Sequence, residues 1–240
     1  MEQEKKQQES IYSGNFADSQ IMFDLLPAEV KALADARQKM NGLELLGKFS
    51  DGAVPAVFFD PQYRGVLDKL KHGNEGARQK GRAELSQMSE EVITEFVSEI
   101  DRVLKPSGHL LLWVDKFHLV EGVDGWIEGT RLEVVDLVTW DKAKFGMGFR
   151  TRRQSEYLMV LQKAPKKAKG YWTAHNIPDV WTEKVGRHHP HAKPEKLQSA
   201  LIEAIVMPGD FVVDPASGGW SVQRSAAAVG RHSIGADLAG

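Results

Sequence analysis

Two apolar segments that each end at an acid constrain the fold most. Residues 54–59 (Val-Pro-Ala-Val-Phe-Phe) read as a strand that runs directly into residues 60–63 (Asp-Pro-Gln-Tyr). Residues 211–213 (Phe-Val-Val) read as a second strand, which leads into residues 214–219 (Asp-Pro-Ala-Ser-Gly-Gly). Open α/β sheets bind ligands just beyond the carboxyl ends of buried strands. We therefore expect both tips to face one pocket. Residues 60–63 are the candidate catalytic tip, and they precede the candidate nucleotide-binding turn at residues 214–219 in the chain.

Helices and strands alternate along the remaining sequence. Ser89 is a good helix N-cap, and apolar residues at helical spacing follow it until residues 105–108 (Lys-Pro-Ser-Gly) end the helix. Residues 109–114 form a continuous apolar run, typical of a strand in a sheet covered on both faces. This alternation predicts an α/β fold with a mainly parallel sheet. The other expected elements are helices over residues 28–36 and 43–49, after Pro194 and up to Val229, an antiparallel strand pair over 131–140 and 155–162, and a strand over 232–237.

Composition limits both the number of domains and the chemistry. A chain of 240 residues that is 42% hydrophobic can bury one sizeable core, so we expect one main domain. The net charge of -2 argues against a uniformly basic surface, so contacts with a polyanion must come from local clusters. The absence of cysteine excludes disulfides, thiolate metal ligands and thiol nucleophiles, and fits a reducing compartment. No apolar run approaches the roughly 18 residues of a membrane span, so we expect a soluble, cytoplasmic protein.

Three segments lack the pattern of a packed core. Residues 1–14 are charged and glutamine-rich and are expected to form a disordered tail, which leaves residues 15–240 as the domain. Residues 64–88 are polar and contain several glycines, which is typical of a flexible segment or a functional lid. Residues 163–187 show no clear periodicity.

Basic residues gather locally in a chain that is otherwise nearly neutral. Such clusters can neutralise phosphates. Tyr171 and Trp172 directly follow several lysines and could stack on unpaired bases, or equally fill a small hydrophobic cluster. Residues 188–191 (His-His-Pro-His) predict no metal site, because adjacent histidines rarely converge on one ion. The candidate nucleic-acid-binding residues are Arg64, Lys71, Arg150, Arg152, Arg153, Lys166, Lys167, Lys169, Tyr171 and Trp172.

Single side chains at the two tips indicate what the pocket could bind. Asp60 and Tyr63 would place an anion and a flat π surface at one rim, which suits an aromatic amine. A glycine turn at 218–219 would let the backbone approach a cofactor. Asp237 ends the next strand about twenty residues later, the spacing of acids that accept hydrogen bonds from ribose hydroxyls. Ordinary readings stay open for each: an Asp-Pro surface turn, a core tyrosine and a solvated acid.

With these segments in place, residues 40–240 resemble the S-adenosylmethionine-dependent amino-methyltransferases of DNA, in their circularly permuted β class. Residues 60–63 resemble the family's Asp-Pro-Pro-Tyr catalytic motif, and residues 213–219 its cofactor motif. Residues 230–237 are similar to the strand with the ribose-binding acid, and residues 41–46 occupy the place of the segment that contacts the cofactor's adenine. Four segments in the permuted order make the match specific.

The resemblance implies a Rossmann-like class I methyltransferase fold, with a mainly parallel seven-stranded sheet and an antiparallel hairpin. It implies S-adenosylmethionine as the cofactor and residues 163–187 as a short DNA-recognition segment. It assigns catalysis to Asp60, Pro61, Gln62 and Tyr63. The cofactor-binding residues that it implies are Asn41, Asp60, Lys193, Asp214, Pro215, Ala216, Ser217, Gly218, Gly219 and Asp237.

The implied reaction is methyl transfer to the exocyclic amine of a flipped base. Asp60 would accept one N–H bond from the amine, a carbonyl of Pro61 or Gln62 would accept the other, and Tyr63 would stack on the base. Members whose motif begins with Asp favour adenine N6, which is our expectation, in double-stranded DNA. Cytosine N4 and RNA are alternatives, whereas carbon methylation of cytosine would need a thiol. Assembly of the protein into a homodimer is a further possibility that the sequence leaves open.

Four positions depart from the family pattern. Gln62 replaces the second proline of the catalytic motif, and Asn41 stands where aspartate is common. Ala216 replaces a phenylalanine of the cofactor motif, and Trp220 stands where glycine is usual. These departures keep open a second reading, in which the chain is a nucleic-acid-binding subunit with impaired catalysis.

Overall fold

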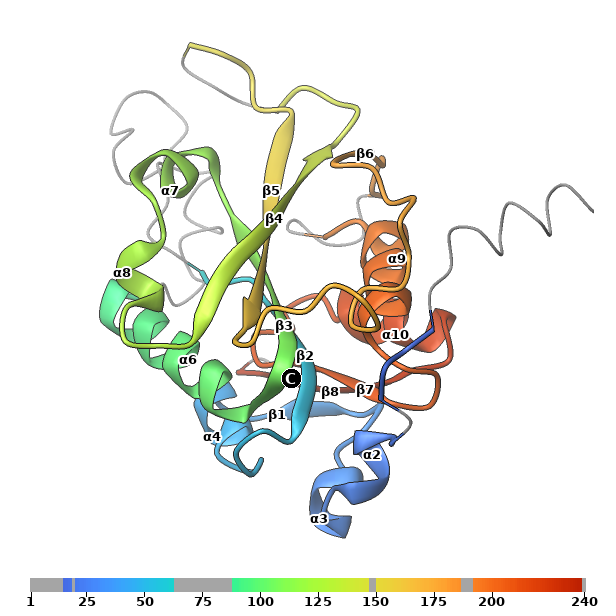
Figure 1. The fold of residues 1–240 in the computed structure, drawn as a ribbon. Coiled ribbons are helices and arrows are strands. Elements are labelled where there is room, and N and C mark those ends of the chain that lie inside the picture. Colours follow the sequence, from blue (N-terminus) through green and yellow to red (C-terminus); the bar gives the residue numbers. More distant parts are fainter. Residues whose placement is uncertain (1–14, 19, 63–87, 147–149, 187–191, 239–240) are drawn as a thin grey trace, which may run out of the picture.

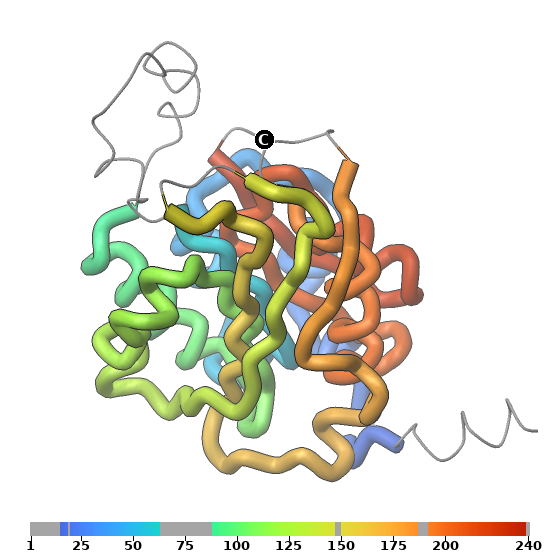
Figure 2. The backbone as a smooth tube through the Cα atoms, turned by 90° about the horizontal axis from the view of Figure 1, so that it is seen from above, coloured from blue at the N-terminus to red at the C-terminus, as the bar shows by residue number. Residues whose placement is uncertain are grey.

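The computed structural model describes residues 15–18, 20–62, 88–146, 150–186 and 192–238. The expectations for residues 1–14, 64–87 and 188–191 lie outside this part of the chain. The described residues form one eight-stranded sheet between two layers of helices (Figures 1 and 2). In sheet order the strands are β1 (Arg37–Lys39), β8 (His232–Asp237), β7 (Phe211–Asp214), β2 (Val54–Phe59), β3 (Leu104–Val114), β5 (Ser155–Lys163), β4 (Leu132–Asp141) and β6 (Val180–Thr182).

Most neighbouring strands run parallel, as the alternation of elements predicts. The pairs β1–β8, β8–β7, β7–β2, β2–β3 and β4–β6 are parallel, and only β5 is antiparallel to its neighbours β3 and β4. The sheet thus has eight strands rather than seven. Short strands at both edges, β1 and β6, were not expected from the sequence.

Helices cover both faces of the sheet, and β2 shows why its sequence is apolar throughout. Successive side chains of a strand point to opposite faces. Val57 and Phe59 therefore pack beneath α4 (Gly42–Leu46) and α6 (Glu90–Val103), whereas Ala56 and Phe58 face α9 (Glu195–Ile205) and α10 (Ser221–Ala228). Because both faces are buried, the strand needs no polar position.

The helix expected after Ser89 is confirmed as α6. The Ser89 hydroxyl accepts a hydrogen bond from the Val92 amide at 3.4 Å, and the buried side chains of α6 repeat at helical spacing. Residues 105–108 do end the helix, but β3 already begins at Leu104. The register of β2 against β3 shifts between Leu104 and His109, so the strand absorbs these residues as an irregularity.

Near the N-terminus the expected helix over residues 28–36 is too long. Only α3 (Ala28–Lys31) forms, and the chain then turns at Asp35, whose φ is 58°, into β1. The Asp35 carboxylate accepts the Ser233 amide at 2.9 Å and contacts His232 at 2.6 Å, so ties to β8 override local helix propensity. Three further short helices were not expected: α2 (Met22–Leu25), α7 (Lys116–Glu121) and α8 (Asp124–Ile127).

The expected antiparallel pair of strands is confirmed as β4 and β5. The hairpin tip that joins them and the segment that follows β5 lie at opposite ends of this pair. β4 pairs with β5 from Leu132 opposite Lys163 to Asp141 opposite Ser155. The hairpin tip after Asp141 therefore lies at the edge where β3 ends, whereas the chain after Lys163 leaves from the edge where β3 begins. Among the described residues, no helix has the length and apolar character needed to cross a membrane.

Candidate functional site

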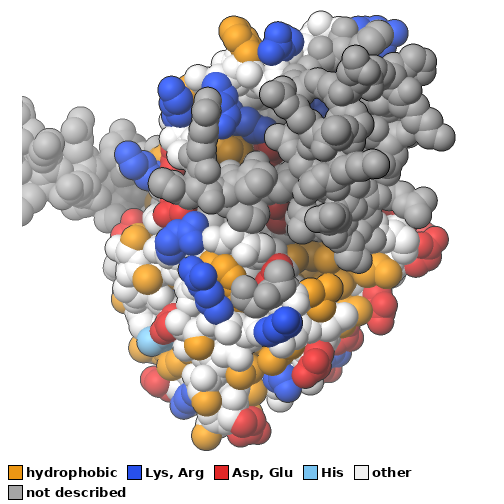
Figure 3. All heavy atoms as spheres, turned by 180° about the vertical axis from the view of Figure 1, so that it is seen from behind, with side chains coloured by type: hydrophobic (Ala, Val, Ile, Leu, Met, Phe, Trp, Pro, Cys, Tyr) orange, Lys and Arg blue, Asp and Glu red, His pale blue; other side chains and the backbone are white. Residues whose placement is uncertain are grey.

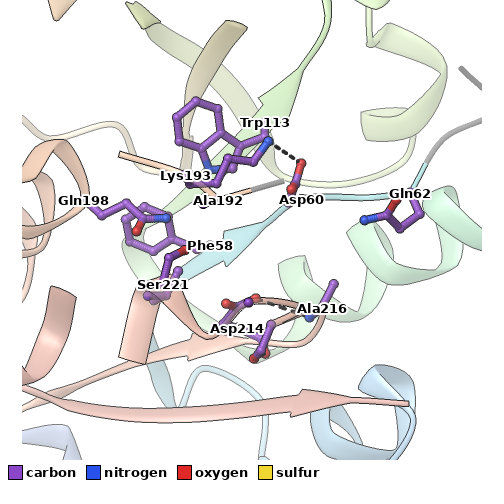
Figure 4. Close-up of a pocket in the computed structure, with 14 residues that line it drawn as sticks. Phe58, Asp60, Gln62, Trp113, Ala192, Lys193, Gln198, Asp214, Ala216 and Ser221 are labelled. Atoms are coloured by element: carbon purple, nitrogen blue, oxygen red, sulfur yellow. Dashed lines mark hydrogen bonds and ion pairs between the residues drawn. The ribbon is translucent and has the colours of Figure 1, made fainter. Parts of the chain in front are cut away.

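The carboxyl ends of β2, β7 and β8 bring three acids to one edge of the sheet: Asp60, Asp214 and Asp237. A pocket opens there (Figure 4). It is lined both by residues from the tip of β2 and by the glycine turn after β7, so the two segments that the sequence singles out do meet. The expected site residues that line the pocket are Asp60, Gln62, Lys193, Asp214, Ala216, Ser217, Gly218 and Gly219.

Hydrogen bonds hold the glycine turn against β8. The Ser217 amide donates to the Ala236 carbonyl at 2.9 Å, and the Ser217 hydroxyl donates to the Asp214 carbonyl at 2.8 Å. Gly218, with a φ of 45°, donates its amide to the Asp237 carboxylate at 3.1 Å. Asp237 is therefore bound to Gly218, which lines the pocket.

Asp214 is the buried acid of this edge, with only 5% of its surface exposed. One of its carboxylate oxygens accepts the Ala216 amide at 3.2 Å. Burial raises the pKa of Asp214 to about 7, and the negative charges of Asp60 and Asp237 act in the same direction. A cation bound nearby would favour its ionised form.

Lys193 occupies the other side of the pocket and contacts two carboxylates. Its Nζ lies 3.0 Å from Oδ1 of Asp60 and 2.9 Å from Oε2 of Glu156, and 4.7 Å from the ring centroid of Trp113. Burial alone would lower the pKa of Lys193, but Asp60 and Glu156 outweigh it and raise the pKa above its usual value. Lys193, expected among the cofactor-binding residues, thus contacts the catalytic tip.

Glu156 carries a second ion pair, to Lys142. Burial acts to raise the pKa of Glu156, yet Lys193 and Lys142 lower it to about 2. Sequence reasoning missed Glu156 and Trp113. A usable signal was present, since Glu156 opens an apolar strand and Trp113 lies next to the carboxyl end of another.

The remaining residues of the expected catalytic tip, and of the segment expected to contact the cofactor's adenine, have other contacts. Pro61 is buried, and the carbonyl of Gln62 accepts the Met88 amide at 2.8 Å. Asn41 is exposed, and its side chain caps α4 by accepting the Leu43 amide at 2.8 Å. Gly42 beside it packs so closely that a Cβ would overlap the carbonyl oxygen of Pro215. Tyr63 lies outside the described residues.

Three of the basic residues lie at the same edge as the pocket. The Arg153 guanidinium lies 5.8 Å from the ring centroid of Phe117, in the helix that follows β3, and the Arg152 Nε donates to the Gly146 carbonyl at 2.6 Å. Arg150 is exposed beside them. In Figure 3 basic side chains gather at the top of the molecule, where Figure 1 places the β4–β5 tip.

The other basic candidates lie at the opposite edge, so the basic residues that are close in the sequence do not form one cluster in the structure. Lys166 pairs with Glu133 at 2.6 Å, and the Lys167 Nζ lies 5.8 Å from the Tyr171 ring centroid. Lys169 lies between Lys167 and Tyr171 in the chain. Trp172 packs against the core under α9, so the hydrophobic reading holds for it. Arg64 and Lys71 are outside the described residues.

Comparison with known proteins gives a consistent result. The sequence model of a DNA methylase family, named for N6 and N4 methyltransferases, matches residues 54–239. The type II methyltransferase M.HhaII of Haemophilus parahaemolyticus is 56% identical over 210 residues, which are 86% of this chain and 92% of that protein. The type II methyltransferase M2.DpnII of Streptococcus pneumoniae is 26% identical over 221 residues, 81% of each chain.

Two solved structures show the same fold at low sequence identity. An M1.HpyAVI–SAM complex superposes with a TM-score of 0.60 at 16% identity, covering 84% of this chain and 91% of that one. The cytosine-N4-specific PvuII DNA methyltransferase superposes with a TM-score of 0.63 at 15% identity, covering 84% and 83%. From the family match and the 56% identical relative we conclude that the chain belongs to the DNA methylase family of N6 and N4 methyltransferases.

Proposed function

We propose that the protein transfers a methyl group from S-adenosylmethionine to the N6 amine of adenine in double-stranded DNA. Methylation of DNA with this cofactor follows from the family; the target atom and the roles of single residues are the proposal. The observation that carries it is one pocket lined by both Asp60 and the turn at Gly218–Gly219. A cofactor held by the turn would lie beside the acid that receives the target amine.

The donors and acceptors of the pocket fit S-adenosylmethionine. When bound, this cofactor supplies a methyl group activated by a sulfonium cation. Two carboxyl groups, Asp60 and Asp214, line the pocket, and a third, Asp237, contacts the lining residue Gly218; this negative charge suits a cationic ligand. Asp237, at the end of β8, would accept hydrogen bonds from ribose hydroxyls, and Gly218 in the turn would let the cofactor approach closely.

The catalytic tip supports attack by an exocyclic amine. The lone pair of such an amine is delocalised into the base, so the nitrogen must become pyramidal to attack. Asp60 would accept one N–H bond and the carbonyl of Pro61 or Gln62 the other; the Gln62 carbonyl also accepts the Met88 amide. In the proposed reaction the nitrogen would form the new N–C bond while the electrons of the broken C–S bond stay on sulfur, and the proton lost from nitrogen would pass to solvent. Orientation of reactants can supply about 7–11 kcal/mol in such a reaction.

Adenine is favoured over cytosine because the catalytic motif begins with Asp60. The fold does not favour either base, because the PvuII enzyme with the same fold is cytosine-N4-specific. Duplex DNA is the proposed substrate, with the base flipped into the pocket at a cost of a few kcal/mol.

The test is incubation with labelled S-adenosylmethionine and a mixed panel of duplex DNA, single-stranded DNA and RNA, followed by digestion to nucleosides. We expect N6-methyladenine from duplex DNA. Only N4-methylcytosine would refute the adenine assignment, and label only in RNA would refute the substrate. Asp60→Ala should lower methylation at least about 100-fold. Calorimetry on the same variant should still detect the cofactor, whereas no binding by the folded wild-type protein would favour an impaired subunit.

A further inference from the structure

We propose that Glu156 is a positioning residue of this site: it holds Lys193, and through Lys193 it orients the Asp60 carboxylate toward the target amine. The inference rests on the proposed function, because it assumes that Asp60 receives the amine. It assigns a role in the reaction to a strand residue that never needs to contact the substrate.

Four alternating charges run in a line from the hairpin to the catalytic tip. Lys142, just after β4, contacts Glu156 at the start of β5. The other oxygen of Glu156 contacts Lys193 at 2.9 Å, and Lys193 contacts Asp60 at 3.0 Å. Each inner charge of this line, which we call the charge line, thus has an opposite charge on either side. Its members come from three separate parts of the chain that meet at one edge of the sheet.

Lys193 has little freedom to leave this position. Its side chain is only 12% exposed, against 30% for Glu156 and 26% for Asp60. An ammonium group that is nearly buried needs opposite charges close by, since an unpaired one is costly. The ring of Trp113 lies against the same ammonium and adds an attraction to its face (Figure 4). Lys193 therefore fixes one oxygen of Asp60 in place.

Glu156 also decides how strongly Lys193 acts on Asp60. The target nitrogen becomes positively charged as it takes the methyl group, and the negative charge of Asp60 stabilises it. Without Glu156, the full positive charge of Lys193 would act on Asp60 and would repel the positive charge that develops on the target nitrogen. With Glu156 sharing that charge, Lys193 can orient Asp60 while the carboxylate remains a strong hydrogen-bond acceptor.

The test separates positioning from charge and from folding. Glu156→Gln leaves the charge line with one positive charge too many, so the decisive variant is Glu156→Gln with Lys142→Met, which restores its net charge. We expect the single-turnover rate of this double variant to fall at least about tenfold. Its dissociation constant for S-adenosylmethionine, from calorimetry, should stay within about twofold of the wild type. Full recovery of the rate would mean that only net charge matters, and an equal loss of cofactor affinity would mean that Lys193 serves the cofactor; either result overturns the proposal.

A readout that needs no substrate follows Lys193 itself. Acetylation of lysines at alkaline pH, mapped by mass spectrometry, should proceed several-fold faster at Lys193 in the double variant, because loss of Glu156 lowers the pKa of the ammonium. Unchanged reactivity would show that Glu156 does not hold Lys193 and would overturn the inference even with an inactive enzyme. If the wild-type protein methylates no nucleic acid, the proposed function fails, and the acetylation result still judges the interaction between Glu156 and Lys193.

Glu133→Gln is the matched control. Glu133 lies on the same hairpin and pairs with Lys166 at 2.6 Å, but at the opposite edge of the sheet. Its loss should leave the rate, the cofactor affinity and the reactivity of Lys193 unchanged. A tenfold slower rate in this variant would show that the hairpin responds to removal of any ion pair and would contradict a specific role for Glu156.

Discussion

Asp214 is the residue whose protonation should depend on the cofactor. Its pKa of about 7 in the free protein arises mainly from burial. A sulfonium cation in the same pocket favours the carboxylate and lowers that pKa, so the complex holds fewer protons than the free protein. Affinity for S-adenosylmethionine should therefore rise as the pH increases toward the pKa of Asp214 in the free protein, and it should level off above that pKa.

Proton release upon binding checks this prediction. Calorimetry near pH 6.5, in two buffers that differ in ionisation enthalpy, should show release of a fraction of a proton, between about 0.5 and 1. Asp214→Asn cannot release that proton, so its binding enthalpy should lose most of the dependence on buffer. Equal enthalpies in both buffers for the wild type would contradict the assignment to Asp214.

Trp220 shows how one residue can depart from a family pattern without breaking the turn. It stands where glycine is usual and still adopts the left-handed conformation, with a φ of 57°. That conformation costs about 1–2 kcal/mol for a residue with a side chain. Its ring is only 4% exposed, and removing a buried aromatic ring costs about 3–5 kcal/mol. Packing is the larger effect.

Trp220→Gly should therefore lower the free energy of unfolding by about 1–4 kcal/mol, although it restores the usual residue. Urea denaturation of the cofactor-free protein measures this change. Arg37→Ala removes only the guanidinium 5.9 Å from the Trp220 ring centroid and should cost less than about 1 kcal/mol. A more stable Trp220→Gly variant would mean that backbone strain, rather than burial, dominates at this turn.

At the residue scale, the sequence predicts the site residues that follow parallel strands, but it misses a site residue that is brought there by the pairing of distant strands. Asp60, the turn at 218–219 and Asp237 each follow an apolar strand, so their shared edge could be foreseen. Glu156 enters the same edge from an antiparallel strand, and only its pairing with β3 places it there. Lys193 lies ahead of a helix, and one of its two partners, Glu156, is brought to it by that same pairing.

At the element scale, the packing of α4 against the glycine turn is close enough to test. A Cβ on Gly42 would overlap the Pro215 carbonyl oxygen and lie 2.7 Å from the Phe96 ring. Two backbone segments would then have to move apart, and overpacking of this kind costs about 1–3 kcal/mol. Gly42→Ala should lower the free energy of unfolding by this amount, measured by urea denaturation.

Gly125→Ala is the control, because a Cβ there meets nothing within 4 Å. It lies in the short helix α8, where alanine is the better helix former, so stability should stay the same or rise slightly. A Gly42→Ala protein as stable as the wild type would show that α4 and the turn can separate freely.

Elements with strong internal patterns are predicted well, and short ones are not. The helix α6 has a cap and a full apolar stripe, and β2 is apolar throughout, so both follow from local sequence. Strand β1 has three residues and exists because β8 pairs with it; the exposed Arg37 and Lys39 give no strand pattern. The same holds for β6, which forms only beside β4.

At the scale of the whole molecule, the direction of the strands decides which surface can meet DNA. The nine residues of β5, about 25–30 Å in length, separate the two groups of basic residues. In the sequence the arginines at 150–153 and the lysines at 166–169 look like one basic cluster, because they are close in the chain. The chain after Lys163 thus leaves β5 far from the pocket and returns toward it at β6, which pairs with the end of β4.

The arginines at the pocket edge should therefore bind the DNA backbone. In a variant with Arg150→Gln, Arg152→Gln and Arg153→Gln, we expect weaker binding to duplex DNA and a shallower dependence of log affinity on log salt. The slope should fall by about 0.9 for each phosphate that the variant no longer neutralises. Fluorescence anisotropy over a salt series measures both quantities. In the control, Lys166→Gln, Lys167→Gln and Lys169→Gln remove the same charge from the opposite edge and should leave the slope unchanged. If the control loses as much affinity as the arginine variant, DNA must wrap beyond the pocket edge, and the polarity of the fold would no longer predict the binding surface.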